Sequence, residues 1–205
     1  MSPNRVFLLS PASCGGERAR LIFDDRARFE LARRVRTSQG APLGEVFAFL
    51  SGLYFRGKLA YATSFARPPD GCDGVLVITP TDGLMPAQAP IGIEGLQRFA
   101  SVDIARADAR YTAPLLRDAQ RLDRRMGPQC ELVLLGSVAT AKYVDVLAPM
   151  FGERLRFPSD FVGRGDMSRG GLLLRCVDAG RELEYVPVAG ATRHGPRPPR
   201  LQPRA

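Results

Sequence analysis

Short apolar runs along the chain alternate with longer stretches in which apolar residues recur every three or four positions. The runs are rich in Val, Leu, Ile and Phe and are bounded by Gly, Pro, Ser or Asp, which is typical of buried strands. We predict strands at residues 6–9, 75–80, 131–136, 154–158 and 182–188. The run at 75–80, "VLVITP", has the clearest strand pattern of the five.

The longer stretches have the period of amphipathic helices that face a core. One helical region, residues 45–66, is interrupted at Ser51-Gly52, so we expect two helices that meet there. Gly127 is the expected stop of another helix, and residues 81–92 are expected to form a loop. The other predicted helices cover residues 17–23, 25–36, 93–100, 111–127, 140–152 and 167–180.

The alternation of strands and helices predicts an α/β fold, a three-layer sandwich around a largely parallel central sheet. Three predicted strands end in the polar loops "SPASCGG", "TPTDGL" and "GSVATAKY". The carboxyl ends of parallel strands line the ligand crevice, so we expect these loops to converge on one pocket with residues 156–175, "RFPSDFVGRGDMSRGGLLLR". We assign residues 1–188 to a single α/β domain and 189–205 to a Pro/Arg-rich basic tail.

Composition narrows the class of protein. No apolar run approaches the roughly 20 residues that span a bilayer, and the first residues, "MSPNR", make a poor signal peptide. We therefore expect a cytoplasmic protein with no membrane partner. The four cysteines are scattered without a Cys-x-x-Cys pair, and His194 is the single histidine. Such a set makes a zinc site improbable, and we expect neither a metal nor a cofactor.

The formal net charge is +8, and half of that excess lies in the tail, which carries four arginines and no acid. Arginines without an amphipathic pattern favour contacts with phosphates that do not depend on base sequence. The four are Arg193, Arg197, Arg200 and Arg204.

Several motifs resemble those of a known family. "FLSGLYFRGKLAYATSFA", an apolar strand that ends "ITPTDGLMP", and a strand–Gly–Ser–helix unit that leads to "RFPSDFVGRGDMSRGGLL" are similar to the bacterial peroxide-stress (YaaA-like) family. They also resemble the uracil-DNA-glycosylase-like domain of archaeosine synthase. The resemblance covers roughly residues 5–175. It implies a uracil-DNA-glycosylase-like fold with a pocket for a nucleobase, nucleoside or nucleic acid. The first loop departs from the family, because it lacks the lysine or arginine often found there.

The segment 156–175 is the most unusual part of the chain, since glycines and charged residues replace an apolar run. Its glycines permit close backbone approach, and Arg164 and Arg169 can form paired hydrogen bonds with phosphate or carboxylate. The alternative is a solvated turn with helix caps. In "GSVATAKY", Ser137, Thr140 and backbone amides could contact a phosphate or a base, although this loop lacks the ending of a phosphate-binding P-loop. The candidate binding residues are Ser10, Ser13, Cys14, Gly15, Ser51, Gly52, Tyr54, Gly136, Ser137, Lys142, Arg164 and Arg169.

Three acids are candidate catalytic residues: Asp82, Asp160 and Asp166. A glycosidic-bond enzyme needs a carboxylate to orient water or to stabilise a cationic sugar. For Asp82 an ordinary Asp-Gly turn is the favoured explanation. Cys14 and Arg20 have the Cys-x5-Arg spacing of phosphatase loops, but Leu21 stands where those loops usually place Ser or Thr.

Two hypotheses about function follow. The first is an N-glycosylase-like enzyme that acts on a nucleobase of nucleic acid, DNA in preference, extruded into the crevice. The second is a non-catalytic nucleic-acid- or nucleotide-binding protein with a role in stress or phage defence. A phosphatase is a third, more distant alternative. The base, the kind of nucleic acid and the oligomeric state stay open.

Overall fold

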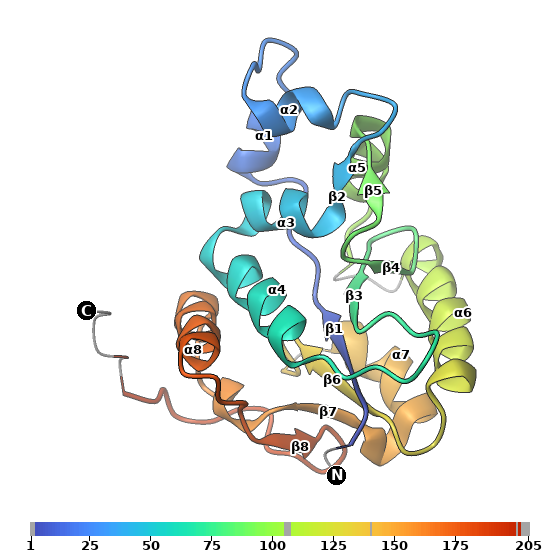
Figure 1. Cartoon of the computed structure of the whole chain (residues 1–205), viewed down its shortest axis with the longest axis vertical. Helices are drawn as coiled ribbons and strands as arrows, with labels where there is room; N and C mark the ends of the chain where they lie inside the picture. The colour runs from blue at the N-terminus through green and yellow to red at the C-terminus, as the bar shows by residue number, and fades with distance from the viewer. Residues whose placement is uncertain (1–2, 105–107, 140, 200, 202–205) are drawn as a thin grey trace.

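A central sheet organises the structure, a computed structural model that describes residues 3–104, 108–139, 141–199 and 201 (Figure 1). Within these residues the sheet has six strands in the order β4-β3-β1-β6-β7-β8. The strands are β1 (Arg5–Leu9), β3 (Val75–Ile78), β4 (Leu84–Pro86), β6 (Glu131–Leu135), β7 (Leu155–Pro158) and β8 (Tyr185–Pro187).

The four inner strands are parallel. β1 pairs with β3 on one side and with β6 on the other, and β6 pairs with β7. Every residue of β1 is buried, as expected for a central strand that is covered on both faces. The edge strands β4 and β8 are antiparallel to their neighbours. The predicted α/β class with a largely parallel central sheet is therefore confirmed.

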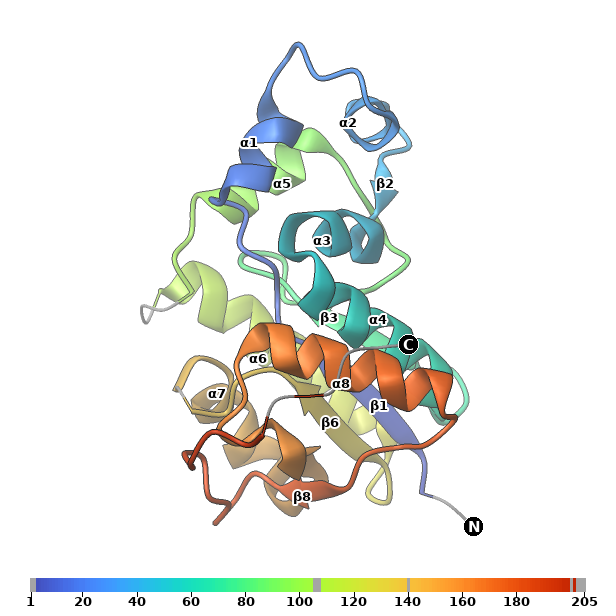
Figure 2. The ribbon, with the colours of Figure 1, turned by 90° about the vertical axis from the view of Figure 1, so that its left-hand side faces the viewer.

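Helices cover both faces of the sheet (Figures 1 and 2). α4 (Leu53–Phe65) and α8 (Asp166–Asp178) pack together on one face. α6 (Ala109–Met126) and α7 (Ala141–Phe151) lie on the other. This helix–sheet–helix arrangement is compatible with the predicted three-layer sandwich.

Most of the remaining elements gather beyond the carboxyl end of β1, at the top of Figure 1. This upper part contains a two-stranded ribbon, β2 with β5. Two 3-10 helices, η1 (Gly152–Arg154) and η2 (Ser159–Phe161), flank β7. The elements of the upper part are α1 (Glu17–Phe23), α2 (Glu30–Arg34), β2 (Ala41–Pro42), α3 (Leu43–Ser51), β5 (Pro90–Ile91) and α5 (Ile93–Ala100).

Two sequence predictions of local structure were wrong. The helix predicted at 25–36 is shortened to α2, which ends at Arg34 before a series of turns. Residues 81–92 contain β4 and β5 instead of a loop. Gly83 has a φ of +68°, and the turn it makes with Asp82 folds β4 back onto β3. A glycine there provides the left-handed conformation at no steric cost.

The interruption at Ser51-Gly52 was predicted correctly. α3 ends at Ser51, Gly52 has a φ of +65°, and α4 begins at Leu53. In the part of the chain that the structure describes, no helix is both long and apolar enough to cross a membrane.

Candidate functional site

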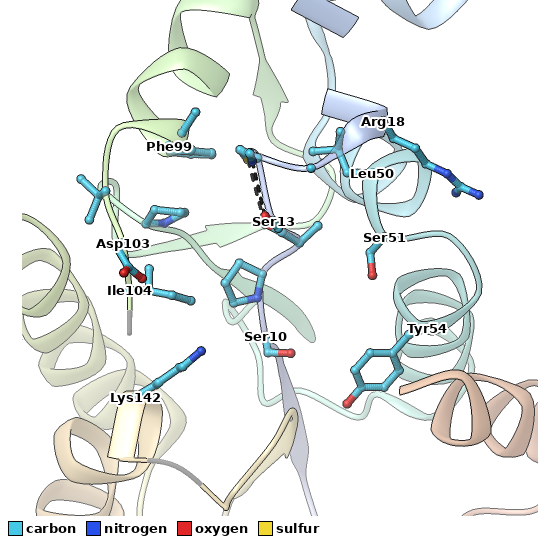
Figure 3. A pocket seen from close by; sticks show the side chains of 18 of the residues that line it. Ser10, Ser13, Arg18, Leu50, Ser51, Tyr54, Phe99, Asp103, Ile104 and Lys142 are labelled. Atoms are coloured by element: carbon cyan, nitrogen blue, oxygen red, sulfur yellow. Dashed lines mark hydrogen bonds between the residues drawn. The ribbon is translucent and has the colours of Figure 1, made fainter. Parts of the chain in front are cut away.

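A cleft of about 990 Å³ lies at the carboxyl ends of β1, β3 and β6, beneath the upper part of the molecule (Figure 3). Ligand pockets in proteins have volumes of roughly 300–1,000 Å³, so this cleft can hold a nucleoside-sized molecule. Its lining comes from the loop 10–18, the α3–α4 junction, Pro80, residues 99–104, Ser137, the first turn of α7 and Asp166.

Nine of the predicted site residues line this cleft. Figure 3 shows the side chains of Ser51, Tyr54 and Lys142 directed toward the space around Ser10. They come from different elements that meet only in the folded chain. The nine are Ser10, Ser13, Cys14, Gly15, Ser51, Tyr54, Ser137, Lys142 and Asp166. Thr140 lies outside the described residues.

The other predicted residues are not part of the lining. Asp82 accepts a hydrogen bond from the Thr81 hydroxyl at 2.7 Å and pairs with Arg98 at 3.1 Å, so it belongs to the turn before β4. Asp160 lies exposed in η2. Gly52 and Gly136 do not line the cleft themselves but lie against residues that do. A Cβ at Gly136, for example, would lie 2.9 Å from the Cβ of Ser10.

The two arginines of segment 156–175 bind their own segment. Arg164 Nε donates to the Asp160 carbonyl oxygen at 3.0 Å. Arg169 donates two hydrogen bonds to the Phe161 carbonyl oxygen, at 3.2 and 3.0 Å, and its guanidinium lies 5.3 Å from the centre of the Phe161 ring. In this structure both arginines hold η2 and the loop after it against the start of α8.

Two of the four glycines in this segment lie close to the backbone of other segments. Gly163 has a φ of +72°, and a Cβ there would collide with the carbonyl oxygen of Pro196 in the tail. Gly170 lies against the backbone of Leu53 and Tyr54, where α8 crosses α4. Close approach of backbone therefore explains Gly163 and Gly170 without a ligand.

The centre of the site is Lys58, which the sequence analysis did not select. Its side chain is 1% exposed, and its amine lies 2.6 Å from the carbonyl oxygen and 2.8 Å from the hydroxyl oxygen of Ser10. The amine also lies over the rings of Tyr54 and Phe55, at 4.5 and 4.7 Å from their centres. Lys58 is therefore directly behind the cleft wall that Ser10 and Tyr54 form.

Burial dominates the electrostatics around this lysine. Loss of water lowers the pKa of Lys58 to about 7; Asp166 opposes this shift, and Arg169 adds to it. The Tyr54 hydroxyl is buried near the Arg169 guanidinium, makes no hydrogen bond of good geometry with the described residues, and has a raised pKa because of its burial. Burial also raises the pKa of Tyr143, whose hydroxyl interacts with Ser10, to about 12.

One signal in the sequence could have identified Lys58. In "LYFRGKLAYA" it stands four residues after Tyr54 and three before Tyr61, on the face of the helix that carries the large aromatic residues. A lysine on the buried face of an amphipathic helix is unusual, because lysine is almost never fully buried without a partner.

Cys14 lies in the lining but does not have the properties of a thiolate. Its side chain is buried, and burial raises the pKa of the thiol to about 12. Arg20, at the spacing of a phosphatase loop, is exposed on α1 and is not part of the cleft. A phosphatase loop needs the opposite, a thiolate held beside its arginine.

Comparisons with protein-family models, with curated proteins and with solved structures find no match to this chain. Among the described residues no group of three or more His, Cys, Asp or Glu side chains could hold a metal ion.

Proposed function

We propose that this protein is an N-glycosidic hydrolase with a uracil-DNA-glycosylase-like fold, which takes a nucleobase of nucleic acid into the cleft and cleaves its bond to the sugar. Three features support the proposal: the position of the cleft at the ends of parallel strands, its nucleoside-sized volume, and its lining of hydroxyl groups beside aromatic rings and carboxylates. The sequence resemblance to glycosylase-like domains points the same way.

The carboxylate of Asp166 is the observation on which the proposal depends. It is the one of the three predicted catalytic acids that lines the cleft, and its side chain is 71% exposed. As the base leaves, the sugar becomes cationic, and a nearby carboxylate can stabilise that charge or orient the attacking water. Asp166 is in the first turn of α8.

The other lining groups would select and hold the base. The hydroxyls of Ser51 and Ser137 can donate or accept hydrogen bonds, which suits the mixed donors and acceptors of a base edge. The ring of Tyr54 also lines this space and would contact the base. Lys142 is directed into the cleft and would contact the phosphate beside the extruded nucleotide.

A second function, binding of a nucleotide or nucleic acid without chemistry, is favoured by one observation. Arg169 lies 3.6 Å from Asp166, so the carboxylate has a cationic neighbour that partly neutralises it. A carboxylate with a cation beside it stabilises a second cation less well.

Incubation of the protein with DNA and RNA that carry a panel of modified bases distinguishes the two functions. Mass spectrometry of the small-molecule fraction detects any released base, and a binding assay on the same oligonucleotides reports affinity. The hydrolase proposal predicts release of free base from at least one member of the panel. Binding without release from any member would favour the second function.

A further inference from the structure

The contact between Ser10 and Lys58 has no part in base release as proposed above, yet it joins a nucleophile to a base. Ser10 directly follows β1, and its side chain lines the cleft. The Lys58 amine reaches it from behind, 2.8 Å from the hydroxyl oxygen. A serine hydroxyl within hydrogen-bonding distance of a base is the geometry of an activated nucleophile.

Burial and the nearby Arg169 favour the uncharged form of Lys58, whereas Asp166 and the two aromatic rings over the amine favour the charged form. Besides Ser10, the groups that face it are the rings of Tyr54 and Phe55 on α4, and Asp166 and Arg169 on α8. Asp166, the carboxylate that acts on this amine, has Arg169 as its neighbour at 3.6 Å. An isolated buried charge is costly, so the amine exchanges its proton near neutral pH.

The Lys58 amine donates to both oxygens of Ser10, at 2.6 Å to the carbonyl and at 2.8 Å to the hydroxyl. Once the amine has lost its proton, it can still donate one N–H to the carbonyl oxygen, and at the same 2.8 Å separation its lone pair can accept the Ser10 hydroxyl proton. Gly136 supports this arrangement from the next strand, because any side chain there would push the Ser10 side chain out of place. The pair is thus positioned by β1, β6 and α4 together.

We propose that Ser10 and Lys58 form a serine–lysine nucleophilic pair, a second activity of this cleft directed at the carbonyl carbon of an ester. Ser10 Oγ attacks that carbon while its proton passes to Lys58 Nζ. The tetrahedral intermediate expels the alcohol oxygen, which takes the proton from Lys58, and an acyl-Ser10 remains. Water then attacks the acyl carbon, gives one proton to Lys58, and releases the acid as that proton returns to Ser10 Oγ. Serine–lysine pairs of this kind support acyl transfer on other folds.

Ester cleavage suits this lining better than phosphoryl transfer, because one of its two described cations, Lys142, is directed into the cavity and the other, Arg18, is not. The acids Asp103 and Asp166 both line it, and the Arg18 guanidinium is engaged with the Phe49 carbonyl oxygen at 3.0 Å and points away from the cavity in Figure 3. Phosphoryl transfer depends on several cations clamped around the phosphate. An ester needs only the nucleophile, its base and hydrogen-bond donors.

A fluorophosphonate reagent, which modifies activated serines, tests the pair on the full chain, with peptide mass spectrometry to locate the label. We expect label on Ser10 and none on Ser64, an exposed serine of α4. The Lys58→Met variant should lose about 100-fold or more of the labelling rate, because a general base contributes on the order of 10²–10⁴. Arg56→Met, an exposed substitution two residues earlier on the same helix, should label like the parent.

The pH profile of labelling tests the proposal without any substitution. The rate should rise as the pH passes about 7, where Lys58 loses its proton. Lys58→Arg keeps a donor to the Ser10 carbonyl oxygen but is never neutral, so it should fail to label while it remains folded. A flat profile, an unlabelled Ser10, or full labelling of Lys58→Arg would overturn the proposal. Base release depends on Asp166 and is measured separately, so either activity can fail alone.

Discussion

Gly57 on α4 and Gly170 on α8 face each other where the two helices cross. A Cβ at Gly57 would lie 2.7 Å from the Gly170 carbonyl oxygen, and a Cβ at Gly170 would lie 2.8 Å from the Leu53 carbonyl oxygen and from the Tyr54 Cα. This backbone-to-backbone packing holds the helix that carries Lys58 against the helix that carries Asp166. This helix crossing therefore fixes the position of Lys58, behind the cleft wall, relative to Asp166, in the cleft lining.

Gly170→Ala should therefore destabilise the protein. Overpacking costs about 1–3 kcal/mol, and the gain in helix propensity of up to about 1 kcal/mol offsets only part of it. We expect the melting temperature to fall by several degrees. Gly171→Ala is the matched control, because a Cβ there would make an ordinary contact, 3.5 Å from Leu201 Cδ1. Equal melting temperatures for the two variants would show that the crossing can relax.

The buried Lys58 should make stability depend on pH. Its pKa is about 7 in the folded protein and near its ordinary value of 10.5 in the unfolded chain. Between these values the unfolded chain binds a proton that the folded protein lacks, so stability attributable to Lys58 rises with pH by up to about 1.4 kcal/mol per unit. Below pH 7 this contribution is flat.

Chemical denaturation of the parent and of Lys58→Met from pH 6 to 10 measures that effect. The difference in the free energy of unfolding between the two proteins should move in favour of the parent as the pH rises above 7. Parallel curves would mean that Lys58 keeps its proton in the fold.

Cys14 should be unreactive in the native protein. Burial raises the pKa of its thiol to about 12, whereas Cys72 is partly exposed. Iodoacetamide at pH 8 should modify Cys72 and spare Cys14 until the chain is unfolded, as peptide mapping would show. Cys14→Ser should keep the fold and any base release. Rapid alkylation of Cys14, or loss of activity in a folded Cys14→Ser protein, would restore the thiolate hypothesis.

The arginines of the tail should supply affinity for phosphates. Substitution of Arg193, Arg197, Arg200 and Arg204 by glutamine is preferable to deletion, because Pro196 packs against Gly163 and deletion would expose that glycine. Binding to an oligonucleotide should weaken. The slope of log K against the logarithm of the salt concentration should become less negative by roughly 0.9 for each phosphate that the tail no longer neutralises. An unchanged slope would mean that the tail does not bind nucleic acid. Arg200 and Arg204 lie outside the described residues.

Much of the fold could be predicted from the sequence, because the inner strands are continuous apolar runs and the helices have a clear period. The errors arose where short elements depend on distant partners. β4 has only three residues and exists because the turn at Gly83 returns it to β3. The helix predicted at 25–36 has the right period, yet turns replace its ends.

The site residues at the ends of strands could be predicted from the sequence. Those whose role depends on how helices and loops pack could not. Ser10 and Ser137 could be predicted from the sequence because both lie at the ends of parallel strands. Ser10 directly follows β1, and Ser137 follows β6 after a single glycine. Arg164 and Arg169 were selected for their charge, but their partners are backbone carbonyl groups of their own segment. Lys58 was overlooked because a lysine in a helix is usually exposed, and only the folded structure shows it behind Ser10.

The most direct test of the proposed hydrolase is the rate of base release by Asp166→Asn beside Asp160→Asn, with mass spectrometry of the freed base under single-turnover conditions. Both substitutions remove one carboxylate and keep the shape, but only Asp166 lines the cleft. We predict a loss of about 100-fold or more in Asp166→Asn, with affinity nearly intact, and the parent rate in Asp160→Asn. Parent-like release by Asp166→Asn, or no release by the parent protein from any modified base, would contradict the account.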